Sequence, residues 1–384
     1  MQTKLRLLYI YSEIAIKGGT DKVLVEKANY LSQHGYEVLV VTESQMGRPL
    51  SFPLHPDVRH IDMGLDFNKQ YTQGTLRRVF TYYTLMREYA KRLKALLYRE
   101  KPDIVICTMG RSIDFITGIH DGSKKIAEAH TTKQHLRSLH LMEERGGWHK
   151  YAARYLRAKM CRRCASLDAI VLLTSQDADD WKEVRRRVVI PNAVPFVPTR
   201  TSDLSSKQVI MVGRYNDAKG YDYLIPAWEL VHKKHPDWTL NVYGSGELHD
   251  QVVQWIHERS LENSMILHDP VDNIMDKYLE SSICVLSSRY EGFSLVILEG
   301  MSCGVPFVSF DCPYGPRNII RNGEDGLLVN YLDSQALADG INHLIEDEDY
   351  RRQLGTQARK NIMRFSKESV MKQWDEFFKS LVKR

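Results

Sequence analysis

Short apolar segments alternate with amphipathic ones along the chain. The first apolar run, LRLLYIYS (5–12), predicts a buried parallel strand. After a short loop, Thr20 can cap a helix through DKVLVEKANYLSQH (21–34), with Gly35 at its end. The run YEVLVVTE (36–43) predicts the next strand. The chain therefore opens with a βαβ unit, in which a helix connects two parallel strands.

The same alternation continues through both halves of the chain. In the first half we expect a long basic helix around 76–99, and further strands at 103–108, 125–130 and 169–175. In the second half we expect strands at 207–214, 238–246, 264–269, 283–288 and 306–311, separated by helices through 223–235 and 251–260 and from about residue 294. This order of elements is typical of α/β proteins with Rossmann-like parallel sheets.

A chain of 384 residues is longer than one hydrophobic core usually serves, so we expect two domains. The stretch 191–207 is rich in proline, serine and threonine and is typical of a linker. We therefore expect an N-terminal domain over 1–195 and a C-terminal domain over 196–365. The amphipathic segment 366–384, with Ser366 as N-cap, is expected to pack back on the N-terminal domain.

Composition narrows the protein class. The apolar content of 43%, the charged content of 26% and the net charge of +5 are ordinary for a soluble protein and do not alone imply nucleic-acid binding. No apolar run reaches the roughly 18–20 residues of a membrane-spanning helix, and we expect no signal peptide. The six cysteines are scattered, as free thiols of a cytoplasmic protein are. One lone CxxC, Cys161 and Cys164, does not predict a metal site.

The stretch RYEGFSLVILEGMSCGVP (289–306) carries two glutamates around an apolar run. Glu291 falls in the turn after a predicted strand, and Glu299 falls inside an apolar, buried helix that Ser294 caps. The free N–H groups at the start of this helix favour a phosphate, and they belong to Gly292, Phe293, Ser294 and Leu295. Carboxylates accept hydrogen bonds from hydroxyls, so a sugar, a diphosphate and a ribose together would suit the segment.

The E-x7-E spacing, with its flanking GFSLV and CGVP, resembles the donor-site motif of family 4 of the retaining glycosyltransferases. The resemblance covers nearly the whole chain and implies the GT-B fold, two Rossmann-like domains facing across a cleft. It also implies that Glu291 contacts sugar hydroxyls and that Glu299 holds the ribose of the nucleotide. The alternative is a coincidental pair of glutamates, one on the surface and one at the end of a helix.

The segment MVGRYNDAKGYDYLI (211–225) places Arg214 after a strand and Lys219 five residues later. These residues resemble the family's Arg/Lys pair, which neutralises the diphosphate of the donor. A departing nucleoside diphosphate gains negative charge, and fixed cations stabilise it. No Asp-x-Asp run stands after a suitable strand, so we expect no metal ion to take this role. Two solvated surface charges are the alternative.

Three further loops of the second half resemble parts of the same donor site. Gly244, in VYGSGE, resembles a glycine beside the nucleotide. The segment LHDPVDNI (267–274) resembles the family's loop that packs on the base, which implies that backbone groups near Pro270 and Val271 read the base. The segment DCPYGPRNII (311–320) resembles that of members that use UDP-sugars, including UDP-N-acetylhexosamines, to make bacterial surface glycans. Asn318 replaces the usual glutamate of that segment, which weakens the inference about the donor sugar. Tight turns alone would also explain these glycines and prolines.

Two features of the first half complete the expected site. Gly18 and Gly19 precede a helix and permit close approach of a phosphate or sugar. They do not form G-x-G-x-x-G, so a dinucleotide cofactor is disfavoured. His130 resembles a family histidine near the reacting carbon of the sugar, although an isolated histidine is more often structural.

The sequence thus predicts a retaining, metal-independent glycosyltransferase without a cofactor. It would move a hexose or N-acetylhexosamine from a nucleotide sugar, expected to be UDP-linked, to a glycan or lipid-linked acceptor. No nucleophile stands out, so the resemblance implies same-face substitution through an oxocarbenium-like ion pair. The basic segments 76–99 and 149–165 would suit an anionic membrane surface or, equally, a solvated helix face. The rival predictions are a nucleotide-sugar epimerase and a non-catalytic nucleotide- or glycan-binding protein.

Overall fold

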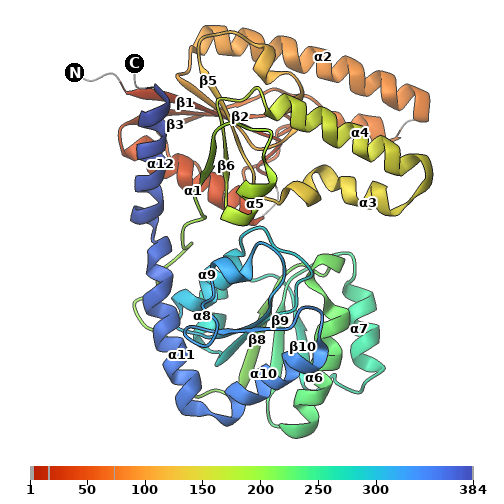
Figure 1. Ribbon diagram of the computed structural model, residues 1–384, viewed down its shortest axis with the longest axis vertical. Coiled ribbons are helices and arrows are strands. Elements are labelled where there is room, and N and C mark those ends of the chain that lie inside the picture. The colour runs from red at the N-terminus through yellow and green to blue at the C-terminus, as the bar shows by residue number, and fades with distance from the viewer. Residues whose placement is uncertain (1–3, 16–17, 73, 383–384) are drawn as a thin grey trace. The chain divides into compact units, whose positions relative to one another are not determined.

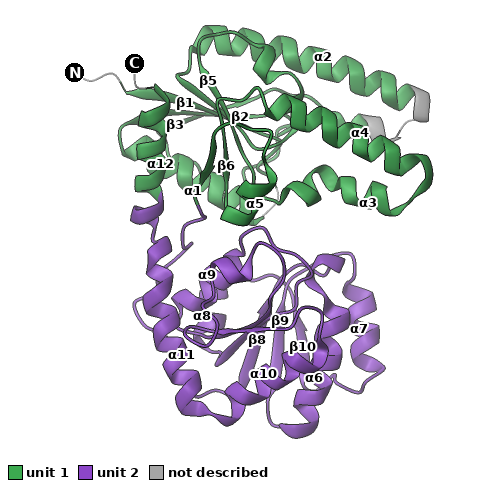
Figure 2. Cartoon of the chain, in the orientation of Figure 1, with its two compact units in different colours: residues 1–190, 371–384 green, residues 191–370 purple. Residues whose placement is uncertain are grey.

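The computed structural model describes residues 4–15, 18–72 and 74–382. The chain divides into two compact units (Figure 2). Unit 1 comprises residues 1–190 and 371–384, and unit 2 comprises residues 191–370. Unit 2 begins before the boundary expected at residue 196, because the linker packs on it: the Val194 N–H donates to the Phe365 carbonyl at 2.9 Å.

Unit 1 is built on a parallel sheet with the strand order β3-β2-β1-β4-β5-β6-β7. Its strands are β1 (Leu5–Tyr11), β2 (Tyr36–Thr42), β3 (Val58–Asp62), β4 (Ile104–Cys107), β5 (Lys124–Glu128), β6 (Ala169–Leu172) and β7 (Arg187–Val189). The strand order reverses direction between β1 and β4. In an open α/β sheet this reversal opens a crevice at the carboxyl ends of the strands, where ligands bind.

Helices complete unit 1 around this sheet (Figure 1). They are α1 (Gly19–Gln33), α2 (Thr75–Glu100), α3 (Leu139–Glu144), α4 (Gly147–Cys164), α5 (Ser175–Asp180) and most of α12 (Lys367–Val382). Short 3-10 helices are η1 (Phe67–Thr72), η2 (Arg111–Asp114), η3 (Ile116–Gly118) and η4 (Lys133–Ser138).

The N-terminal caps expected for α1 and α12 can be compared with the structure. The expectation that Thr20 caps the first helix was wrong: Gly18 has the extended backbone of an N-cap, so α1 begins at Gly19 and Thr20 lies in its first turn. The cap expected at the last helix is confirmed, because the Ser369 N–H donates to Ser366 Oγ at 3.2 Å.

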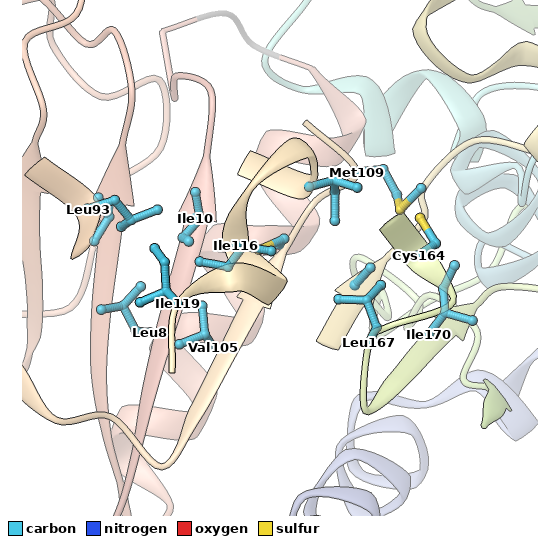
Figure 3. Packing of buried hydrophobic residues seen from close by; sticks show 14 of the residues in the cluster. Leu8, Ile10, Leu93, Val105, Met109, Ile116, Ile119, Cys164, Leu167 and Ile170 are labelled. Atoms are coloured by element: carbon cyan, nitrogen blue, oxygen red, sulfur yellow. The ribbon is translucent and has the colours of Figure 1, made fainter. Parts of the chain in front are cut away.

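The core of unit 1 combines aliphatic side chains from the sheet and its helices. Figure 3 shows Leu8 and Ile10 of β1 with Leu93 of α2 in this cluster, and Cys164 and Ile170 in another part of it. All five side chains are almost completely buried. Burial of a leucine or isoleucine side chain contributes about 1.5–3 kcal/mol, so this cluster fixes the strands whose ends carry functional loops.

Unit 2 is built on a second parallel sheet, with the order β10-β9-β8-β11-β12-β13. Its strands are β8 (Gln208–Val212), β9 (Thr239–Tyr243), β10 (Met265–His268), β11 (Ile283–Leu286), β12 (Phe307–Phe310) and β13 (Leu327–Val329). The strand order reverses between β8 and β11, which pair directly through Ile283 and Val209. The loops that follow β8 and β11 therefore meet at the ligand-binding edge of this sheet.

The helices of unit 2 lie on both sides of its strands, with α8, α9 and α11 on one side and α6 and α7 on the other in Figure 1. They are α6 (Tyr221–Lys234), α7 (His249–His257), α8 (Ile274–Leu279), α9 (Leu295–Ser302), α10 (Ser334–Glu346) and α11 (Glu348–Asn361). Short 3-10 helices are η5 (Asp217–Lys219), η6 (Pro316–Asn318) and η7 (Ile362–Phe365). The prediction of two Rossmann-like parallel sheets is confirmed.

The structure also bears on the predictions about membrane-spanning helices and cysteines. Each helix within 4–15, 18–72 and 74–382 is too short or too polar to cross a bilayer. All six cysteines are buried free thiols. Cys161 and Cys164 lie on α4, and burial raises the pKa of Cys164 to about 12, so its thiolate is disfavoured at neutral pH.

Candidate active site

The carboxyl ends of β8 and β11 bring Lys219 and Glu291 together. Lys219 Nζ lies 2.6 Å from Glu291 Oε1, and Ser288 Oγ donates to the same oxygen at 2.7 Å. The two charged side chains retain 17% and 13% of their exposed area, so the pair is partly buried but open to a ligand. Both residues were predicted to belong to a donor site, but nothing in the sequence indicated that they pair with each other.

Glycines hold the two side chains in this arrangement. The Lys219 side chain lies against Gly213, where an added Cβ would come 3.2 Å from Lys219 Cε. An added Cβ on Gly315 would come 2.4 Å from Glu291 Cβ, and the backbone of Glu291 bridges that of Tyr314. The loop after β12 thus supports Glu291, and no larger residue fits at Gly315 without displacing it.

Arg214 and Gly244 lie in neighbouring loops of unit 2. Arg214 directly follows the Gly213 turn, and its side chain is exposed. Gly244 follows β9, and a Cβ there would come only 1.8 Å from the Gly213 carbonyl oxygen. The close approach of these two loops therefore explains why a glycine is needed at position 244. The prediction that it lies beside a nucleotide stays a prediction.

The helix α9 begins at the expected place. Ser294 occupies the N-cap position and is buried, but its side chain makes no capping hydrogen bond, so the expected side-chain cap was wrong. The Phe293 ring packs edge-on against Phe365, with 5.3 Å between ring centroids. Gly292 and Leu295, on either side, are half-buried. The first turn of α9 therefore has backbone N–H groups that the Ser294 side chain does not satisfy.

Glu299 lies inside α9 and is 9% exposed. Its Oε2 accepts a hydrogen bond from the Tyr278 hydroxyl of α8 at 3.2 Å. Burial, and then the nearby Glu299 charge, raise the pKa of Tyr278, so this hydroxyl stays a donor. Tyr278 was missed in the sequence because only the packing of α8 on α9 places it against Glu299.

The remaining predicted residues of unit 2 lie after β10 and in η6. Pro270 is exposed and Val271 is half-buried, both just after β10. Asn318, which replaces the expected glutamate, lies in η6 and donates its side-chain amide to the Tyr314 carbonyl. Because Tyr314 also bridges Glu291, Asn318 helps to hold the loop under that carboxylate.

The predicted residues of unit 1 are two glycines at the start of α1 and a histidine beside a buried ion pair. Gly18 is the N-cap of α1, and the exposed Gly19 is its first residue. His130 follows β5, and its Nε2 lies 3.3 Å from Glu128 Oε1. That carboxylate also pairs with the ammonium of Lys27, and both charged side chains are almost completely buried.

This buried cluster determines the charge of His130. Burial lowers the pKa of His130 below its ordinary value, although the Glu128 charge opposes the effect. The imidazole is therefore neutral at pH 7. Within the described part of the chain, His130 Nε2, Glu128 Oε2 and the Tyr9 hydroxyl are buried without a hydrogen-bond partner. Such atoms are rare in native structures, so this location is suited to a polar group from a ligand or water.

Comparison with known proteins assigns the family. The profile of the group 1 glycosyl transferases matches residues 198–361, and that of glycosyltransferase family 4 matches residues 17–196. The chain belongs to the glycosyltransferases with the GT-B fold. The two profiles together cover both units, and the prediction of an enzyme of this family is confirmed.

The chain is similar to individual proteins over part or nearly all of its length. The glycosyltransferase is 35% identical over 229 residues to an exopolysaccharide phosphotransferase of Streptomyces coelicolor, spanning 58% of this chain but only 24% of that protein. It is 25% identical to the amylovoran biosynthesis glycosyltransferase AmsD of Erwinia amylovora, over 97% of this chain and 99% of AmsD. A mutant of S. aureus TarM, solved with fondaparinux, α-GlcNAc-glycerol and UDP, has a TM-score of 0.76. That alignment covers 97% and 99% of the two chains at 15% identity, which shows the shared fold.

Proposed function

We propose that this glycosyltransferase is a retaining enzyme that transfers a hexose or N-acetylhexosamine from a UDP-sugar to a saccharide acceptor. The observation that carries the proposal is the Lys219–Glu291 pair at the switch point of unit 2. A cation and a hydroxyl acceptor stand side by side there, as a sugar joined to a diphosphate requires. UDP bound to the related TarM fold and the DCPYGPRNII segment support the choice of nucleotide.

In this proposal the donor diphosphate displaces Glu291 from Lys219. The Lys219 ammonium, the exposed Arg214 and the first N–H groups of α9 neutralise the charge that grows on the leaving diphosphate. Glu291 is then free to accept hydrogen bonds from sugar hydroxyls. Glu299 accepts from the ribose, and backbone groups near Pro270 and Val271 contact the base. These groups supply the positive charge that a metal ion supplies in other enzymes, so we propose metal-independent transfer.

The roles proposed for unit 1 rest on the family resemblance: neutral His130 contacts the sugar near its reacting carbon, and Gly18 and Gly19 approach the donor. No side chain is assigned as a nucleophile, so the acceptor attacks on the face from which the diphosphate leaves. We propose a glycan or lipid-linked saccharide as acceptor, because AmsD is named for polysaccharide biosynthesis and TarM was solved with a glycosylated glycerol. The proposed location is the cytoplasmic face of a membrane.

Two measurements test this function. The first measures the thermal unfolding midpoint in the presence of UDP, GDP or ADP. A ligand that binds only the native state raises this midpoint, and the tightest ligand at a given concentration raises it most. UDP is expected to give the largest increase. The second follows UDP release and anomeric configuration by NMR with a UDP-sugar and acceptor, with and without EDTA. Glu291→Gln is expected to retain UDP binding and to lose at least about tenfold in transfer rate. An inverted product, or isomerised donor without acceptor, would contradict the proposal.

A further inference from the structure

Unit 1 contains a cavity that none of the predicted site residues lines. Its volume is about 680 Å³. Ser12, Glu43 and Gly110, which follow β1, β2 and β4, form its floor, and residues of α2, α3 and α4 form its walls. The cavity therefore lies at the strand reversal of unit 1, where open α/β sheets bind their ligands.

Positive charge dominates the polar side of the cavity. Four cationic side chains line it, against the two carboxylates of Glu43 and Asp114; the cations are Arg78, Arg111, Arg137 and Lys159. Arg111 Nη1 lies 3.0 Å from Glu43 Oε2, and Arg137 Nη1 lies 3.0 Å from Asp114 Oδ1. Lys159 is exposed and has no ion-pair partner among the described residues. Counted over its lining residues, the cavity has four positive and two negative side chains, a balance that favours an anion.

The arginines are held before any ligand arrives. Glu43 is buried and also accepts a hydrogen bond from the Tyr89 hydroxyl at 3.0 Å, so it is a rigid anchor for Arg111. Arg137 Nη2 donates to the Gly110 carbonyl at 2.6 Å. The backbone of Arg137 has a φ of +52°, which is costly for a residue with a Cβ and is typical of functional sites. Fixed guanidinium groups lose little entropy when they bind a phosphate.

The opposite side of the cavity is apolar. It consists of Val79 and Tyr82 from α2, Leu139 and Met142 from α3, and Leu156 from α4. Val79 and Leu156 are exposed, at 64% and 41%, so the apolar side continues to the surface. A ligand that satisfies both sides carries an anionic group next to an apolar chain.

Exposed aromatic side chains extend this apolar side along two helices. On α2 they are Phe80 and Tyr83, and on α4 they are Trp148, Tyr151 and Tyr155. The residues on α4 recur at helical spacing, so they form one stripe, and α4 also carries Lys150, Arg154, Arg162 and Arg163. Exposed aromatic rings beside basic side chains are typical of surfaces that lie in the interface of an anionic membrane.

We propose that this cavity binds the phosphate or diphosphate of a lipid-linked saccharide acceptor, with its apolar chain running along the aromatic side chains of α2 and α4. The inference rests on the proposed function and names the acceptor class. Lys159, Arg78, Arg111 and Arg137 bind the phosphate oxygens, and Val79 and Leu156 contact the first part of the chain. A soluble phosphate-bearing polymer would use the cations but would leave the apolar half of the cavity and the aromatic stripe uncovered.

The test is flotation of the full-length protein with phosphatidylcholine vesicles that contain a polyprenyl diphosphate. Vesicles with phosphatidylglycerol at the same total charge measure attraction to any anionic surface. Lys159→Ala is expected to weaken binding to the polyprenyl diphosphate vesicles about tenfold, as loss of one charge-assisted hydrogen bond does. Leu156→Asp, at an exposed position, is expected to weaken it similarly. Lys182→Ala, an exposed lysine of unit 1 outside the cavity, is the matched control and should bind like the wild type.

The outcomes separate this inference from the proposed function. Equal binding to both vesicle types, or displacement by a soluble poly(glycerol phosphate) as effective as by polyprenyl diphosphate, would overturn the lipid assignment. If Lys159→Ala and Leu156→Asp both bind the polyprenyl diphosphate vesicles like the wild type, the cavity is not the binding site. Stabilisation by UDP depends on unit 2 and is expected in all these variants. If UDP does not stabilise the wild-type protein, the proposed function is overturned instead.

Discussion

The Lys219 ammonium lies 2.6 Å from the Glu291 carboxylate across 72 residues of sequence. In the protein without ligand, these side chains neutralise each other. A donor that binds between them must replace this ion pair with better partners for both charges, a phosphate for the lysine and hydroxyls for the glutamate. The pair therefore favours a ligand that offers both groups over one that offers a phosphate alone.

Replacement of Lys219 tests the phosphate side of this pair. Lys219→Ala is expected to weaken UDP binding about tenfold or more, because one charge-assisted hydrogen bond to the diphosphate is lost. The measurement is isothermal titration with UDP. Lys233→Ala on α6 is the control, since Lys233 is an exposed lysine of the same unit that pairs with Glu229. An unchanged affinity in Lys219→Ala would remove Lys219 from the donor site.

The Lys27–Glu128 pair permits a test of the buried cluster beside His130. Lys27→Met is expected to destabilise the protein by about 3–5 kcal/mol, because Glu128 would remain charged and unpaired in the core. The Lys27→Met/Glu128→Leu double variant is expected to recover much of this loss, as an apolar pair often replaces a buried ion pair. Urea unfolding of the two variants measures the difference. If the double variant is less stable than Lys27→Met, the unpaired Glu128 charge is not the cause of the lost stability, and this explanation is wrong.

These examples show which features of the fold the sequence could predict. The central strands β1, β4, β6, β8 and β11 have apolar side chains on both faces, and their runs were recognised. The strands that were missed, β3, β7 and β13, all lie at sheet edges. An edge strand has one neighbour and is partly exposed, so VRHID and RVV lack a continuous apolar run.

The site shows the same division. Glu291, Glu299 and Lys219 follow predicted strands or lie in a predicted helix, so their places were readable from local pattern. Lys27 was not singled out, because a lysine in an amphipathic helix looks like a solvated residue. Its burial depends on Glu128, which is 101 residues away, and on the Trp374 ring 4.0 Å from its ammonium. Contacts of this sequence separation leave no periodic signal.

Gly244 provides a test of loop packing in unit 2. Gly244→Ala is expected to destabilise unit 2 by about 1–3 kcal/mol or more, since the added Cβ would overlap the Gly213 carbonyl oxygen. Differential scanning calorimetry measures the shift in the unfolding midpoint. Gly118→Ala is the matched control, because its Cβ would enter open space in unit 1. Equal midpoints for both variants would contradict this account of the loop.

Acid is expected to destabilise unit 1 through His135. Burial, followed by the nearby charges of His140 and Arg157, lowers the pKa of His135 to about 4. The unfolded chain binds a proton near pH 6.5 and the folded one only near pH 4, so the free energy of unfolding falls as the pH drops through this window. Thermal midpoints between about pH 7.5 and 4.5 should fall less steeply in His135→Gln. His257→Gln, exposed in unit 2, should retain the wild-type slope.

The helix α12 begins in unit 2 and continues into unit 1 without a break. Trp374, Phe377 and Phe378 of its second half are buried. The Tyr36 hydroxyl donates a hydrogen bond to Asp375 Oδ1 at 2.7 Å. Unit 1 is thus completed by a segment that follows the whole of unit 2 in the sequence. Unit 2 is continuous in sequence, so deletion of residues 371–384 would remove part of the core of unit 1 and leave every residue of unit 2 in place.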